Sequence, residues 1–101
     1  MSSRRWREDW QRRAQHVHRI IADNDIAMWR KSYLVGHAFQ DVDLGGLKSK
    51  HRKKMLSNIA AVNAILAKYP IKTFDDYVLI EVADLKRILA SFKNIADIKV
   101  S

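Results

Sequence analysis

The chain has 101 residues, a length that allows one hydrophobic core and leaves no room for a second. It contains no cysteine, which excludes a disulfide framework, a thiolate zinc site and a cysteine nucleophile. The net charge of +8 belongs to residues 1–69, because Lys and Arg equal Asp and Glu in number over residues 70–101. Such asymmetry favours a polyanionic partner, either a nucleic acid or an acidic protein surface.

The sequence predicts an all-α, single-domain bundle of about four helices. One proline and three glycines are too few for the turns of a many-stranded fold. The first predicted helix covers residues 4–22, where apolar residues at helical spacing form one face. That face consists of Trp6, Trp10, Ala14, Val17, Ile20 and Ile21. The i, i+4 spacing of the two tryptophans favours core packing over stacking on nucleic-acid bases. We expect residues 1–3 and 95–101 to fray.

The second and third predicted helices cover residues 26–40 and 47–69, with a turn at 41–46 between them. We expect the second helix to bury Ile26, Trp29, Tyr33 and Phe39. The apolar stripe of the third consists of Leu47, Met55, Val62, Ile65, Leu66 and Tyr69. A second stripe of small residues, at Ala60, Ala64 and Ala67, would let another helix approach closely. Pro70 ends this helix.

The last predicted helix begins after Thr73, in the sequence TFDD, which matches a capping box. Its apolar residues at helical spacing are Phe74, Val78, Val82, Leu85, Leu89 and Phe92. The β-branched residues of YVLIEV favour a break, a short irregular segment or a short strand near residues 78–83.

The sequence LGGLKSKHRKKM, at residues 44–55, opens the third predicted helix with a cluster of cations. These are Lys48, Lys50, Arg52, Lys53 and Lys54. Cations at a helix N-terminus are repelled by the macrodipole and by one another, so the arrangement does not favour folding. A bound phosphate would relieve this repulsion, because unpaired N–H groups and the dipole also attract anions there.

The first predicted helix carries a second basic surface that is rich in arginine. We take Arg4, Arg5, Arg12 and Arg19 as further candidates for phosphate binding. The guanidinium of arginine binds phosphate with two parallel hydrogen bonds, whereas lysine acts as a point charge. No motif for reading bases is present, so the leading hypothesis is a non-catalytic protein that binds the backbone of DNA or RNA, as an accessory subunit of a larger complex.

Several alternatives stay open beside nucleic-acid binding. The cationic cluster is also typical of a solvated face that serves only solubility. The chain could be an adaptor or inhibitor, such as a phage-type antagonist, that docks on an acidic protein surface. It could also form a homodimer. We expect no membrane partner, because the other helices need the apolar face of the first to build a core, and we expect a cytoplasmic location.

The histidines do not indicate a metal or a cofactor. His16 and His18 point to different faces of the first helix, so they cannot ligate one ion together. Helical ribonucleases of the HEPN type carry an Arg and a His with four to six residues between them. Arg30 and His37 match that spacing, as does the pair Arg13 and His18. In a chain so rich in arginine such matches arise by chance, and we expect no catalysis.

Overall fold

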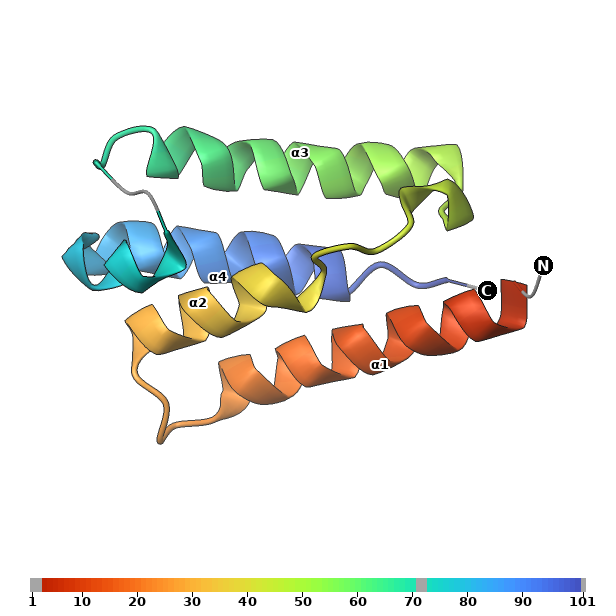
Figure 1. The fold of residues 1–101 in the computed structure, drawn as a ribbon, viewed down its shortest axis with the longest axis horizontal. Coiled ribbons are helices and arrows are strands. Elements are labelled where there is room, and N and C mark those ends of the chain that lie inside the picture. Colours follow the sequence, from red (N-terminus) through yellow and green to blue (C-terminus); the bar gives the residue numbers. More distant parts are fainter. Residues whose placement is uncertain (1–2, 71–72, 101) are drawn as a thin grey trace.

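The computed structural model describes residues 3–70 and 73–100 of the chain. Within them the fold is helical throughout, which confirms the predicted all-α bundle (Figure 1). The elements are α1 (Ser3–Ala22), α2 (Met28–Ala38), the 3-10 helix η1 (Leu44–Gly46), α3 (Ser49–Leu66), the 3-10 helix η2 (Phe74–Leu79) and α4 (Val82–Ala96). No helix in the described part of the chain is both long enough and apolar enough to cross a bilayer.

Helix α4 is the common packing partner of the other three helices. In Figure 1, α1 and α3 run along opposite edges of the molecule, with α2 and α4 between them. Ile88 and Ile95 of α4 are completely buried among α1, α2 and α3. Among the described elements, α3 packs extensively against α4 alone.

The N-terminal half of α1 is fixed by its two tryptophans. Trp10 is 1% exposed and lies between the rings of Trp6 and Phe39, with centroid separations of 5.6 Å and 4.9 Å. Its indole Nε1 donates a hydrogen bond of 3.3 Å to the carbonyl of Ile98. The predicted core role of Trp10 is therefore confirmed.

The same contact ties the C-terminal segment to α1. Helix α4 continues to Ala96, and Ile98 beyond it is buried. Trp10 bonds to this segment from the other end of the chain, a contact that local sequence does not reveal, and fraying of residues 95–101 stays a prediction. Residues 1, 2 and 101 lie outside the described residues.

The buried face of α2 differs from the predicted one. Ser32 and Val35 are completely buried, whereas Trp29 and Tyr33 are only partly buried. The Ser32 hydroxyl donates to the carbonyl of Met28 at 3.2 Å, which satisfies it inside the core. The buried face of α2 is therefore centred on Ser32 and Val35, and not on Trp29 and Tyr33 as the apolar pattern predicts.

The predicted interruption near residues 78–83 is confirmed. Helix η2 ends at Leu79, the chain is extended at Ile80, and α4 begins at Val82. Because of this break, Val78 and Val82 are 58% and 59% exposed, although the apolar pattern predicted them to be buried. The side chain of Thr73 makes no capping hydrogen bond, so the Thr73 half of the predicted capping box is not formed.

A buried carboxylate joins the end of α3 to the start of α4. Asp84 is 5% exposed and accepts hydrogen bonds from the hydroxyl of Tyr69 and, at 3.3 Å, from the ammonium of Lys68. Arg87 lies 3.5 Å from the same carboxylate. The hydrogen bond from Tyr69, followed by those cations, lowers the pKa of Asp84 below its usual value of 3.8.

We predict that Asp84→Asn lowers the melting temperature at neutral pH, because the amide cannot pair with Lys68 and Arg87. Since the folded-state pKa is lowered, the stabilisation by Asp84 is complete above about pH 4 and is lost as the pH falls through the folded-state pKa. The difference between variant and parent should therefore shrink below about pH 3. Thermal unfolding followed by circular dichroism at neutral and at acidic pH tests this. A difference in melting temperature that is equal under the two conditions would contradict it.

Candidate nucleic-acid interface

Helix α3 begins without any group that balances its dipole. Lys48 is the N-cap residue and provides no side-chain capping hydrogen bond, and the first turn contains no acidic residue. Ser49 and Lys50 follow as the first residues of the helix, and both are exposed. The positive end of the α3 dipole therefore faces solvent beside like charges.

Within the described residues, the lysines around this helix start have no carboxylate partner. No carboxylate side chain occurs in the sequence between Asp43 and Asp75. Lys48, Lys50, Lys53 and Lys54 are all exposed, and none of them forms an ion pair with any carboxylate in the described chain. Asp43 precedes the cluster, and its carboxylate accepts a hydrogen bond of 2.8 Å from the backbone of Gly45. We call Lys48, Lys50, Lys53 and Lys54 the lysine cluster.

Arg52 has a structural role that the sequence did not reveal. Its Nε donates to the carbonyl of Leu44 at 3.3 Å, and its Nη2 donates to the carbonyl of Leu47 at 3.1 Å. The guanidinium thus holds the turn before α3 against the helix. Arg52 thus differs from the lysine cluster, because its guanidinium is hydrogen-bonded to backbone carbonyls of the same chain.

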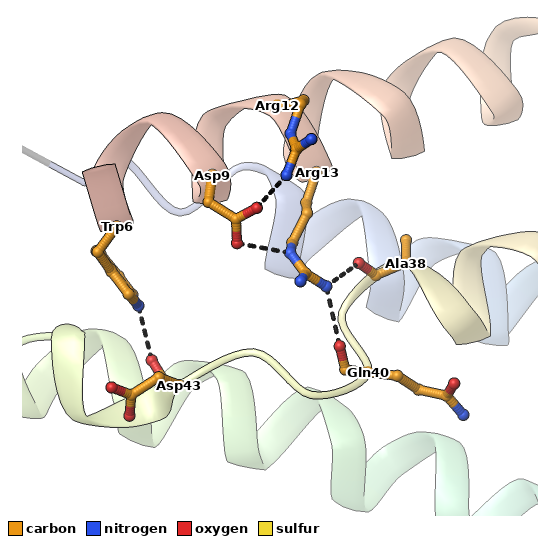
Figure 2. Close-up of polar contacts among 7 residues, drawn as sticks. All are labelled: Trp6, Asp9, Arg12, Arg13, Ala38, Gln40 and Asp43. Carbon is orange, nitrogen blue, oxygen red and sulfur yellow. Dashed lines mark hydrogen bonds and ion pairs between the residues drawn. The ribbon is translucent and has the colours of Figure 1, made fainter. Parts of the chain in front are cut away.

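Three arginines of α1, by contrast, have acidic partners. Arg4 pairs with Glu8 at 3.2 Å, and Asp9 pairs with both Arg12 and Arg13 (Figure 2). The hydrogen bond from Arg13, followed by that from Arg12, lowers the pKa of Asp9. Arg5 also has an interaction partner within the chain. Glu8 and Asp9 thus offset part of the charge on α1, which keeps more cations than carboxylates.

Arg13 also connects α1 to the C-terminal end of α2. Its Nη1 donates to the carbonyls of Ala38 and Gln40, each at 2.9 Å, while its Nε holds Asp9 (Figure 2). The last carbonyls of a helix lack backbone donors, and a cation there also complements the dipole. The sequence signal for this role was weak, because the two helices meet only in the fold.

A shallow hollow of about 320 Å³ lies beside this contact, between α1 and the end of α2. Its lining includes Arg12, Arg13, His16 and Arg19, so it is basic. Two of these, Arg12 and Arg19, are predicted phosphate-binding residues that now lie on one side of α1.

The two basic surfaces approach one another where α1 and α3 begin. The indole of Trp6 donates to the carbonyl of Asp43 at 2.9 Å (Figure 2). A side chain at Gly46 would meet the Trp6 ring at 2.3 Å, so only glycine allows this close contact. The first turn of α1, with Arg4 and Arg5, thus lies against the turn that precedes the lysine cluster. The hollow with Arg12 and Arg19 is further along α1.

Two of the histidines, His18 and His37, contact other side chains of the bundle. His18 lies 3.0 Å from Asp97, whereas Arg13 bonds to the end of α2 on a different side of α1. Arg13 and His18 therefore do not face a common site. Tyr33 lies between Arg30 and His37, with the guanidinium 4.7 Å from the ring centre. No group of three potential metal ligands occurs among the described residues.

The chain matches no family model, no curated protein and no solved structure. The functional assignment therefore depends on the distribution of charge and apolar surface described above.

We predict that Lys50→Glu increases the free energy of unfolding by about 0.5–1 kcal/mol at low salt, because a carboxylate in the first turn complements the α3 dipole. Lys99→Glu changes the net charge equally but lies outside any helix, so it serves as the control. Urea unfolding measures both. A Lys50→Glu variant no more stable than Lys99→Glu would show that the helix start carries no electrostatic strain.

Proposed function

We propose that this protein is a non-catalytic nucleic-acid-binding protein that binds the phosphate backbone at the start of α3. The observation that carries the proposal is the lysine cluster, whose cations have no carboxylate partner in the described chain while arginines of α1 do. Phosphate groups would supply the missing negative charge at the positive end of the helix dipole.

Binding through this cluster would be electrostatic and largely independent of base sequence. Neutralising about four phosphates corresponds to a fall in affinity with salt whose logarithmic slope is about −3 to −4. Arg4 and Arg5, in the turn of α1 whose Trp6 bonds to Asp43, would add contacts, and Arg12 and Arg19 would contact a longer nucleic acid further along α1. Such binding suits an accessory subunit of a cytoplasmic complex on DNA or RNA.

We predict that Lys50→Glu combined with Lys53→Glu weakens binding to a fluorescent duplex at least about tenfold at low salt and reduces the salt slope by about two. The matched control is Lys86→Glu with Lys99→Glu, which makes the same charge change at exposed lysines in and after α4. The control should retain most of the affinity.

Fluorescence anisotropy across a salt series measures both variants, and circular dichroism verifies that each is folded. If the two double variants weaken binding equally, the affinity depends on net charge and not on a site at the start of α3. Failure of the parent protein to bind duplex or single strands at low salt would overturn the proposal entirely.

A further inference from the structure

The hollow between α1 and the end of α2 is lined by cations. Its volume is about 320 Å³, and none of the described residues that line it carries a carboxylate. All the polar side chains of the lining come from α1, and they are Arg12, Arg13, Gln15, His16 and Arg19. A concave surface with this lining attracts an anion.

Arg13 is fixed in place by the fold. Its Nε donates to Asp9 at 2.8 Å, and its Nη1 donates to the carbonyls of Ala38 and Gln40 at 2.9 Å each (Figure 2). Because these three hydrogen bonds hold the guanidinium against α2, Arg13 forms a positively charged wall of the hollow. A bound ligand therefore takes its hydrogen bonds mainly from the other side chains.

Three of those side chains lie on one face of α1. Arg12, His16 and Arg19 follow one another at positions i, i+4 and i+7, and all three are exposed. Arg12 and Arg19 are about 10 Å apart along the helix axis. Two long side chains close that distance by turning toward His16 between them, so the three side chains can converge on one ligand.

The guanidinium groups around the hollow outnumber the carboxylates that balance them. Arg12 and Arg13 share the single carboxylate of Asp9. Arg19 forms no ion pair with any carboxylate in the part of the chain that the structure describes. The acidic residue one turn further on, Asp23, accepts a hydrogen bond of 2.9 Å from the backbone N–H of Asp25. Positive charge therefore stays available to a ligand.

We propose that this hollow binds a phosphate monoester, carried by a free nucleotide or by the end of a nucleic-acid strand. A monoester has about 1.5 to 2 negative charges at neutral pH and three terminal oxygens, so Arg12, His16 and Arg19 can each donate to a different oxygen. A diester within a strand has a single charge, and its chain must continue past the hollow on both sides.

The size of the hollow also favours a terminal group. A volume of about 320 Å³ is at the lower end of the range for ligand pockets, which suits one phosphate with its sugar and not a duplex. None of the residues that line it belongs to the lysine cluster. The inference therefore goes beyond the proposed function, which needs only phosphodiesters.

Two thymidine oligonucleotides of equal charge test the selectivity. A tetramer with a 5′-phosphate and a hexamer with a 5′-hydroxyl each carry about five negative charges, but only the tetramer has a monoester. Amide chemical shifts of the protein follow both titrations. We expect the tetramer to shift residues 12–19 and to half-saturate those shifts at a concentration at least about fivefold lower than the hexamer does.

Adenosine 5′-monophosphate, titrated in the same way, distinguishes the two sources of the monoester. If it half-saturates the shifts of residues 12–19 at the same concentration as the tetramer, the ligand is a free nucleotide. If it needs a higher concentration, the ligand is a strand end.

Two variants locate the site. Arg19→Gln and Arg7→Gln each remove one cation from α1, but Arg7 does not line the hollow and lies about 120° away from Arg19 around the helix. Neither is a core residue, and circular dichroism verifies that both variants are folded. Arg19→Gln should weaken tetramer binding at least about fivefold, whereas Arg7→Gln should change it less than about twofold.

Three results would overturn the proposal. These are equal half-saturation by tetramer and hexamer, tetramer shifts that spare residues 12–19, and equal losses of affinity in the two variants. None of these results would remove binding of a duplex at residues 48–54, so this proposal and the proposed function fail separately.

Discussion

The shared packing of α1, α2 and α3 on α4 is the constraint from which the rest of the structure follows. Ile88 and Ile95 are completely buried within this arrangement. Since α4 serves all three helices, α2 and α3 need not pack on each other, and a groove stays open between them. Because α3 is packed extensively against α4 alone, much of its circumference, including the lysine cluster, faces solvent.

The electrostatic difference between α1 and α3 follows from the same architecture. Helix α1 carries acidic residues one turn from its arginines. Arg13 also donates hydrogen bonds from Nη1 to two carbonyls at the end of α2. Helix α3 has no acidic residue, and the nearest carboxylate before it, on Asp43, is hydrogen-bonded to Gly45. Three arginines of α1 therefore have carboxylate partners within the helix, although α1 keeps more cations than carboxylates, whereas α3 has cations and no carboxylate of its own.

Local pattern predicted much of this fold but not its long-range contacts. The period of apolar residues located α1 almost to the residue, and the absence of nearby acidic residues identified the lysine cluster. Pattern could not show that Ser32 would be buried, because its hydroxyl is satisfied by the carbonyl of Met28 one turn earlier. Nor could it show that Trp10 would hold Ile98, or that Arg52 would bind two carbonyls, since those partners become neighbours only after folding.

The central claim is that unbalanced charge at the start of α3 attracts a polyanion. Amide chemical shifts recorded during titration with a short duplex at low salt test it most directly. The account predicts that the shifts are largest over residues 48–54, with smaller ones in the first turn of α1, and that added salt reverses them. Shifts that are absent there, or that lie mainly on the exposed side of α4, would contradict it.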